Sequence, residues 1–288
     1  MTMYLVTGAL GNVGSHVVQE LLDRDVGVRT ADIAPEALKA RFGGTQQVHL
    51  DLNDSSTFSP ALEGVSKVFL VRPPAISRVG PTLNRLIDHA AQAGVEAIVF
   101  SSVAGADTNT IIPHHRVETH LKESRLAWTI LRPGFFAQNI ESAYRQDIVE
   151  DDRIYVPAAD GKVAFIDARD IAAVAALALT DPSHEMKEYH LTGPQAVTFH
   201  RVAEILSGQL DRDISYEPAS VAGYFTHLLG QGLGVPHALI QTILHAGLRR
   251  GDAEPVTNTV TELLGRPPTS LEQYVDDSVH VWRTAKDG

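Results

Sequence analysis

Three glycines at fixed spacing follow an apolar segment near the start of the chain. Residues 3–7 read Met-Tyr-Leu-Val-Thr, and Gly8, Gly11 and Gly14 follow in a G-x-x-G-x-x-G pattern. An amphipathic helix pattern over residues 12–23 begins inside this loop. A buried strand, a glycine turn and a helix in this order predict a unit that binds a dinucleotide. The alternative is an ordinary glycine-rich turn between a strand and a helix.

Each glycine meets a different steric demand. Gly8 permits the tight turn, Gly11 lets the backbone approach a pyrophosphate, and Gly14 lets the helix pack closely on the strand. The free N–H groups and the dipole at the start of the helix attract negative charge. These demands favour the dinucleotide hypothesis over the plain turn.

The first half of the chain alternates strand and helix patterns. Such alternation predicts βαβ units, and unbroken apolar runs are typical of parallel strands buried on both faces. We therefore predict an α/β fold with a Rossmann-type, doubly wound parallel sheet. The strand patterns cover residues 3–7, 26–31, 47–50, 67–71, 97–101 and 128–131, and the helix patterns cover 12–23, 35–41, 55–62, 78–93 and 112–123.

The second half has shorter strand patterns and more breaks. We expect residues 1–150 to form an NAD(P)-binding Rossmann domain. Residues 151–288 should form a smaller, mainly helical substrate-binding lobe, with some segments returning to the sheet. The strand patterns there are 163–166, 188–191 and 214–217, and the helix patterns are 170–179, 199–210, 219–229, 238–248, 256–264 and 271–282.

A carboxylate stands where the second strand ends. Asp32, followed by Ile33, lies 18 residues after Gly14, the expected place for an acceptor of the adenosine ribose hydroxyls. A carboxylate there repels a 2′-phosphate, so NAD is preferred as cofactor. NADP stays open because Arg29 and Arg41 are near in sequence, and a helix-cap or turn role is the alternative for Asp32.

Two further strand ends carry candidate cofactor contacts. After the third strand, the segment Asp51-Leu52 places a carboxylate where it could meet the adenine amino group, and Asp54 is also a plausible cap for the next short helix. After the fourth strand, the segment Val71-Arg72-Pro73 leaves the sheet beside the predicted cofactor channel, and its prolines stiffen that edge.

Composition excludes several classes of function. The 288-residue chain has a net charge of −11, which disfavours nucleic acid and anionic lipid. It has no cysteine, so disulfides, thiolate zinc sites and cysteine nucleophiles are excluded. It shows no apolar run of ~20 residues and no signal-peptide pattern. We expect a cytoplasmic monomer or homodimer that acts on a small molecule, with no nucleic-acid or membrane partner.

Several segments together resemble a known family. They are TGALGNVG, FLVRPP, FSSVAGA, WTILRPGFFAQNI, FIDARDIAAVAALAL and YHLTGPQAVTFHRVAEIL. Over nearly the whole chain they are similar to the NmrA-like, atypical short-chain dehydrogenase/reductases. The segment IIPHHRVETHL resembles the quinone reductase and triphenylmethane reductase type in particular.

The resemblance implies a Rossmann domain, a small C-terminal lobe and an active site in the cleft between them. Phe135, Phe136 and Asn139 are candidates for one wall of the substrate cleft, and plain core packing is the alternative for them. The resemblance implies cofactor contacts from Gly8, Leu10, Gly11, Asn12, Val13, Gly14, Val71, Arg72, Pro73, Ser101, Ser102, Arg132, Pro133 and Gly134. Ser102 and Arg132 also suit structural roles, as a strand-end turn serine and as a partner of a carboxylate.

The chain departs from the wider superfamily at the catalytic pair. That superfamily uses Tyr-x-x-x-Lys as an acid or base, but no tyrosine lies between Tyr4 and Tyr144, and Arg116 stands where relatives often have lysine. His114 is a candidate catalytic residue because histidine titrates near neutral pH. A solvated or capping histidine is the alternative. We expect no metal, because His114, His115, Glu118 and His120 do not share one helical face.

These observations predict an NAD(P)H-dependent reductase that lacks the Tyr-x-x-x-Lys pair. Hydride would pass to a small quinone-like, dye-like or carbonyl acceptor. The alternative is a non-catalytic redox sensor of the NmrA type that binds the dinucleotide and regulates a partner. An epimerase of nucleotide sugars is disfavoured, since it would need the missing acid or base.

Overall fold

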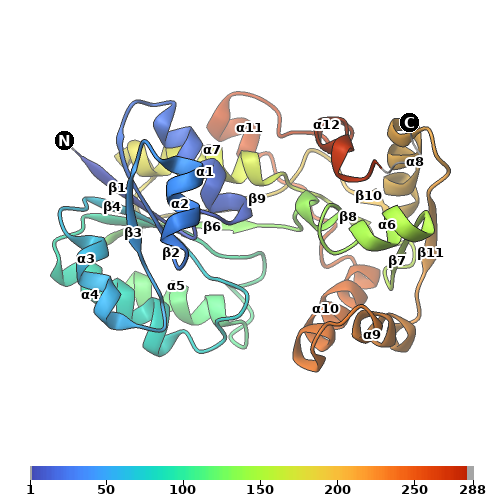
Figure 1. Ribbon diagram of the computed structural model, residues 1–288, viewed down its shortest axis with the longest axis horizontal. Coiled ribbons are helices and arrows are strands. Elements are labelled where there is room, and N and C mark those ends of the chain that lie inside the picture. Colours follow the sequence, from blue (N-terminus) through green and yellow to red (C-terminus); the bar gives the residue numbers. More distant parts are fainter. Residues whose placement is uncertain (1, 284–288) are drawn as a thin grey trace. The chain divides into compact units, whose positions relative to one another are not determined.

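The computed structural model describes residues 2–283, which form two compact units (Figure 1). The first, called here the sheet unit, runs to Pro133 and includes Ala168–Leu191. The second, called the helical unit, comprises Gly134–Asp167 and the chain from Thr192 onward. The division therefore falls at Pro133 and not at residue 150, because strand β6 runs to Pro133 and the chain then leaves the sheet.

The sheet unit contains seven parallel strands in the order β3-β2-β1-β4-β5-β6-β9. Strand β1 lies between β2 and β4, so the strand order reverses beside β1 and creates the crevice in which such sheets bind ligands. This arrangement confirms the predicted doubly wound fold. The strands are β1 (Met3–Thr7), β2 (Gly27–Asp32), β3 (Gln46–His49), β4 (Lys67–Val71), β5 (Ala97–Ser101), β6 (Ala127–Pro133) and β9 (Lys187–Leu191).

Helices cover the sheet because both of its faces are apolar. Helices α1 (Asn12–Leu22) and α7 (Ala168–Thr180) pack against each other, helped by the small alanines of α7, and α2 (Pro35–Phe42) contacts β2 and β3. A separate core joins the sheet to three further helices, and Figure 1 shows these helices beside the sheet. These are α3 (Phe58–Leu62), α4 (Arg85–Gln92) and α5 (Pro113–Glu123).

The helical unit has its own core, in which several large aromatic side chains pack among aliphatic ones. Tyr144, Phe199, Tyr224 and Trp282 are buried in it, and the Trp282 indole N–H donates to the carbonyl oxygen of Ile140 at 3.1 Å. Its helices are α6 (Arg145–Asp151), α8 (Phe199–Leu210), α9 (Val221–Gly230), α10 (Val235–Gly247), α11 (Thr259–Leu264) and α12 (Leu271–Ser278). Its strands are β7 (Arg153–Val156) paired with β11 (Ser215–Pro218), and β8 (Lys162–Val163) paired with β10 (Val197–Thr198).

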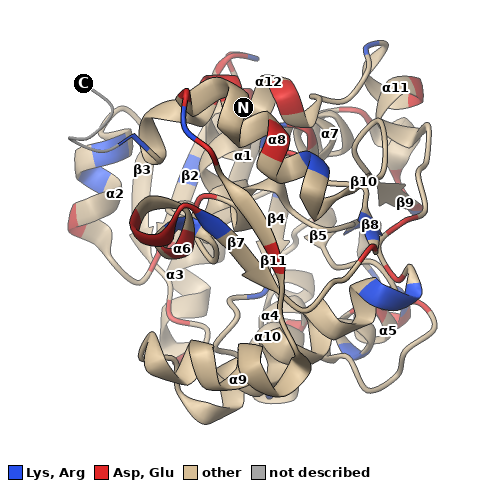
Figure 2. Ribbon diagram, turned by 90° about the vertical axis from the view of Figure 1, so that its right-hand side faces the viewer, with Lys and Arg blue, Asp and Glu red and all other residues tan. Residues whose placement is uncertain are grey.

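Charge is unevenly distributed over the helical unit. Helices α9 and α10 contain no Lys, Arg, Asp or Glu, as Figure 2 shows. Within residues 2–283, no helix combines the length and apolar character required to cross a membrane.

Candidate functional site

The glycine loop follows β1 and is shaped by close backbone contacts. Gly8 has a φ of +60°, and a Cβ atom there would lie 2.7 Å from Val71 Cγ1. A Cβ atom on Gly14 would lie 2.1 Å from the Gly8 carbonyl oxygen. The Gly11 N–H donates to that same oxygen at 2.9 Å and closes the turn. Side chains at Gly8 and Gly14 are therefore excluded on steric grounds.

The start of α1 offers an open set of donors. Gly11 is the N-cap and supplies no side-chain acceptor, and the first turn holds no acidic residue. Among residues 2–283, none accepts a hydrogen bond from the N–H groups of Asn12 or Val13. Unpaired N–H groups at a helix N-terminus carry partial positive charge and bind anions. The residues present therefore fit the pyrophosphate of a dinucleotide.

Asp32 lies at the end of β2 and faces the same loop. Its Oδ2 accepts from the Leu10 N–H at 3.3 Å, and its Oδ1 accepts from the Ile33 N–H at 2.8 Å. The carboxylate is thus held beside the glycine loop, while the Ile33 side chain is exposed. Arg29 is committed elsewhere, because it donates to the carbonyl oxygens of Ala61 and Glu63.

The turn after β3 is organised by its own side chains. Asp51 Oδ1 accepts from the Asn53 N–H at 2.8 Å, and Asp54 Oδ1 accepts from the Ser56 N–H at 3.0 Å. Leu52 is buried between them. Asp54 therefore caps the short helix that follows, as expected. The turn leaves Asp51 Oδ2 for the predicted adenine contact.

The end of β4 positions Arg72. Thr7 Oγ1 accepts from the Val71 N–H at 3.1 Å, which ties β4 to the strand before the glycine loop. Arg72 Nε donates to His114 Nε2 at 3.1 Å. Its Nη1 donates to the carbonyl oxygens of Pro73, at 3.1 Å, and of Ile76. Burial lowers the pKa of this guanidinium, which still stays charged near neutral pH.

His114 is a buried neutral imidazole and not a group that titrates near pH 7. Burial, followed by the charge of Arg72, lowers its pKa to about 3. Its Nε2 accepts from Arg72, so the proton resides on Nδ1, which has no partner among the described residues. The titration argument for a proton donor is therefore wrong, because the side chain is 7% exposed. The alternative of a solvated histidine fails for the same reason.

Ser101 and Ser102 lie at the end of β5, where both are buried. The Ser102 hydroxyl donates to Glu118 Oε1 at 2.5 Å. Its proton is thereby committed, so Ser102 can only accept from a ligand. Sequence reasoning considered Glu118 only as a metal ligand and missed this contact. The available signal was its place beside Val117 and Leu121 on the buried face of α5.

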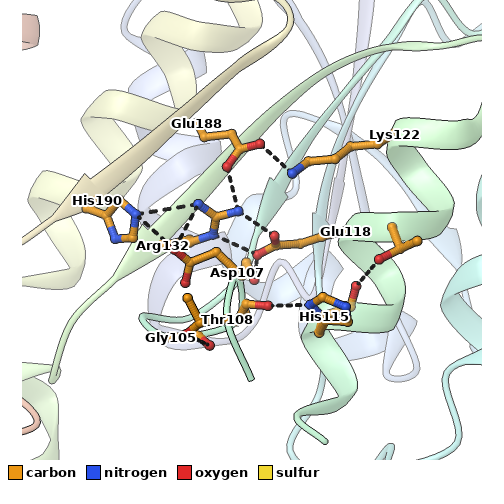
Figure 3. A network of polar contacts seen from close by, with 12 residues as sticks. Gly105, Asp107, Thr108, His115, Glu118, Lys122, Arg132, Glu188 and His190 are labelled. Carbon is orange, nitrogen blue, oxygen red and sulfur yellow. Dashed lines mark hydrogen bonds and ion pairs between the residues drawn. The ribbon is translucent and has the colours of Figure 1, made fainter. Parts of the chain in front are cut away.

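Arg132, in β6, is the centre of a buried charge network (Figure 3). It donates to Glu118 through Nε at 3.0 Å and through Nη2 at 2.6 Å, and Nη2 also meets Glu188 at 2.6 Å. Burial alone would lower the pKa of Arg132, but these two carboxylates raise it. Lys122 pairs with Glu188, and Arg132 Nη1 lies 3.4 Å from His190 Nε2. The structure thus supports the carboxylate-pairing role for Arg132.

The segment after β6 passes from one unit to the other. Pro133 ends the strand in the sheet unit, and Gly134 opens the helical unit. In the helical unit, the Phe135 ring packs edge-to-face on Phe165 and on His245, with centroids 5.7 and 5.6 Å apart. Its packing supports the core interpretation.

Two further residues of this segment were substrate candidates. Phe136 pairs with Ile166 through the backbone, and Asn139 lies in a short 3₁₀ turn. Both side chains are half-buried.

The remaining histidines of α5 have separate partners. His115 Nδ1 lies 2.7 Å from the Ala106 carbonyl oxygen, and His120 Nε2 lies 2.7 Å from Asp88 Oδ1. Residues 2–283 contain no group of three side chains arranged to hold a metal ion.

Comparison with known proteins identifies the family of this chain. The sequence matches the NmrA-like family over residues 2–275. The chain belongs to this family. It is 36% identical over 279 residues to the NAD(P)H azoreductase of Xenophilus azovorans, covering 94% of this chain and 96% of that protein. It is 27% identical over 288 residues to quinone oxidoreductase 2 of Escherichia coli, covering 97% and 99%.

Solved structures of NmrA-like relatives share the fold. The NADPH complex of the NADPH-dependent quinone oxidoreductase QOR2 from E. coli matches with a TM-score of 0.87 at 27% identity, covering 96% of this chain and all of that one. The triphenylmethane reductase of Citrobacter sp. matches with a TM-score of 0.87 at 24% identity, covering 97% and 100%. These structures confirm the predicted fold, and the family match over residues 2–275 confirms the predicted family.

Proposed function

We propose that this NmrA-like protein is an NAD(P)H-dependent reductase for small quinone-like, dye-like or carbonyl acceptors. The observation that carries the proposal is the glycine loop, where Gly8 and Gly14 leave no room for side chains and α1 presents unpaired N–H groups. Relatives that match over nearly the whole chain are named as an azoreductase and a quinone oxidoreductase. When bound, the dinucleotide would supply the hydride.

The residues proposed to hold the dinucleotide follow the carboxyl ends of β1 to β6. The loop and the start of α1 would bind the pyrophosphate, and the end of β2 would bind the adenosine ribose. Ser102 would accept a hydrogen bond, since its own proton goes to Glu118. The full proposed set is Gly8, Leu10, Gly11, Asn12, Val13, Gly14, Asp32, Ile33, Asp51, Leu52, Val71, Pro73, Ser101, Ser102, Arg132, Pro133 and Gly134, with Arg132 acting through Glu118. Arg72, predicted from the sequence as a further cofactor contact, is assigned instead to the acceptor side of the same crevice.

NAD(H) is the proposed preferred cofactor. Asp32 is fixed beside the loop by two backbone N–H groups, and Arg29 is occupied by carbonyl oxygens. A 2′-phosphate would therefore meet a carboxylate at this place. The quinone oxidoreductase of E. coli was solved with NADPH, so this preference would distinguish the present chain from that relative.

The helical unit offers a surface that suits an aromatic acceptor. Helix α10 carries five apolar side chains that are at least half exposed, and exposed apolar surface of this extent commonly marks a binding site. Phe135, Phe136 and Asn139 remain proposed substrate contacts in the same unit. The five exposed residues are Val235, Leu239, Ile240, Ile243 and Leu244.

A redox sensor without turnover is the second candidate. The chain lacks a Tyr-x-x-x-Lys pair, and His114 is a buried neutral group. Calorimetric titration with NADH and NADPH, followed by near-ultraviolet absorbance assays against quinones, azo dyes and aldehydes, separates the two. We expect NADH to bind and to be oxidised by at least one acceptor. Tight binding with no oxidation across the panel would instead support the sensor.

A further inference from the structure

We propose that Arg72, held in position by His114, is the cation that stabilises the negative charge which hydride transfer places on the acceptor. This inference rests on the proposed reductase function and assigns its electrostatic catalysis to one side chain. Arg72 would be the catalytic residue and His114 its positioning residue.

The guanidinium of Arg72 is fixed on one side and open on the other. His114 Nε2 accepts from Nε, and the carbonyl oxygens of Pro73, Pro74 and Ile76 accept from Nη1. Among residues 2–283, none accepts from Nη2, and no carboxylate pairs with the group. Four hydrogen bonds therefore fix the orientation of the half-buried Arg72 guanidinium. No carboxylate neutralises it, and its remaining N–H groups can bind a ligand.

Arg132 provides the contrast within the same unit. Its guanidinium is 2% exposed and is neutralised by Glu118 and Glu188. It therefore has little charge to offer a ligand. Arg72 follows β4 and has no such partner, whereas Arg132 lies within β6, so the two arginines have different roles.

The position of Arg72 in the sheet favours a contact with the acceptor over a contact with the pyrophosphate. The pyrophosphate is already matched by the start of α1, and Asp32 marks the adenosine side of the crevice. A dinucleotide spans the point where strand order reverses, with one half on each side. Arg72 follows β4, on the opposite side of β1 from β2, and reaches toward α5 through His114. This is the side where the nicotinamide and acceptor would lie.

The chemistry requires charge stabilisation and not a protein acid. When a hydride, which is two electrons and a proton, adds to one oxygen of a quinone, the product is a hydroquinone monoanion with its charge on the other oxygen. The dinucleotide is oxidised in the same step, and a proton from water completes the hydroquinone. A preorganised guanidinium close to that oxygen stabilises the developing charge.

His114 suits the positioning role because it is buried as a neutral acceptor. A cationic side chain there would repel the guanidinium, and an apolar one would leave Nε without a partner. Glutamine offers a carbonyl oxygen that can accept from Nε, whereas leucine cannot. The pair His114→Gln and His114→Leu therefore separates the hydrogen bond from the packing.

The test uses the full chain with NADH and 1,4-benzoquinone. We expect Arg72→Met to lower kcat about 100-fold, in the range found when one oxyanion donor is removed, with the Kd of NADH in calorimetry nearly unchanged. Arg72→Lys should recover part of the rate. His114→Leu should lower kcat, and His114→Gln should restore most of it. Arg125→Met, at an exposed arginine outside the site, is the matched control.

A second readout does not depend on turnover. 4-Nitrophenol absorbs differently when it is ionised, so it reports the charge stabilisation offered to a phenolate. We expect the unaltered chain, with the oxidised dinucleotide bound, to favour the bound phenolate, and Arg72→Met to lose this effect.

Three outcomes would overturn the inference. A large rise in the NADH Kd of Arg72→Met with unchanged kcat would assign Arg72 to the cofactor phosphates and leave the reductase function intact. Equal kcat and phenolate spectra in both proteins would remove Arg72 from catalysis. A complete lack of NADH oxidation by the unaltered chain, with every acceptor, would overturn the proposed function and this inference together.

Discussion

The carbonyl oxygen of Gly8 lies 2.1 Å from the place where a Cβ atom of Gly14 would stand. No Cβ atom tolerates a backbone oxygen at that distance, so the start of α1 can approach the end of β1 only because Gly14 lacks a side chain. This approach brings the free N–H groups of α1 to the carboxyl edge of the sheet. The proposed anion site therefore depends on this close packing of α1 against β1.

Substitution of Gly14 tests this relationship directly. Gly14→Ala should push α1 away from β1, lower the free energy of unfolding by about 1–3 kcal/mol and weaken NADH binding at least about tenfold. Chemical denaturation and calorimetry measure the two effects. Gly208→Ala is the control, because Gly208 lies within α8 with no atom near its Cβ position. It should keep or slightly raise stability. Normal NADH affinity in Gly14→Ala would contradict the proposed site.

The identity of the cofactor depends on Asp32. Replacement by serine removes the charge that would repel a 2′-phosphate, so Asp32→Ser should improve NADPH affinity about tenfold relative to NADH. Titration of both cofactors into the two proteins measures this ratio. Asp54→Asn is the control, since it preserves the acceptor that caps its own turn. Tighter binding of NADPH than NADH by the unaltered chain would rule out the preference for NAD.

Local sequence patterns were sufficient to predict the sheet and the glycine loop. Strands such as β4 and β5 are mostly apolar runs. Gly8, Gly11 and Gly14 lie within one short segment of the sequence. The boundary at Pro133 was missed because the motif around it continues without a change in composition. Buried strands and short loops leave a local signal, but a division between units depends on contacts between distant segments.

The charge network around Arg132 could not be predicted from local sequence patterns either. Glu118 and Glu188 come from segments 70 residues apart and meet on Arg132 only after β6 pairs with β9. The burial of His114 likewise depends on its packing against Phe100, at 6.1 Å between ring centroids. No spacing rule in the sequence brings these residues together.

Loss of the Glu118 charge should destabilise the sheet unit. Glu118→Gln removes half of a bidentate pair with a guanidinium that is almost fully buried, although Glu188 still contacts Arg132. We expect the free energy of unfolding to fall by about 2–4 kcal/mol, as measured by urea denaturation. Glu123→Gln, at an exposed position of the same helix, should change it by less than about 0.5 kcal/mol. Equal stabilities for the two variants would show that the buried pair contributes little.

Two buried histidines should make stability fall at acidic pH. Burial lowers the pKa of His114 to about 3 and that of His245 to about 4, whereas both should titrate near pH 6.5 in the unfolded chain. Below about pH 6.5 the unfolded chain binds protons that the folded chain does not, so each histidine lowers the free energy of unfolding by about 1.4 kcal/mol per pH unit. Above about pH 6.5 both rings are neutral in the folded and the unfolded chain, so these histidines lower the free energy of unfolding only below that pH.

His114→Gln isolates one of these contributions. Urea denaturation of the unaltered chain and of the variant between about pH 7 and pH 5 should give a shallower loss of stability in the variant, by about 1.4 kcal/mol per pH unit toward the acidic end. NMR titration supplies an independent check, since the His114 and His245 rings should stay neutral at pH 5. Parallel stability curves, or a His114 resonance that titrates near pH 6.5, would contradict the burial of a neutral ring and would limit its hydrogen bond with Arg72 to pH values above about 6.5.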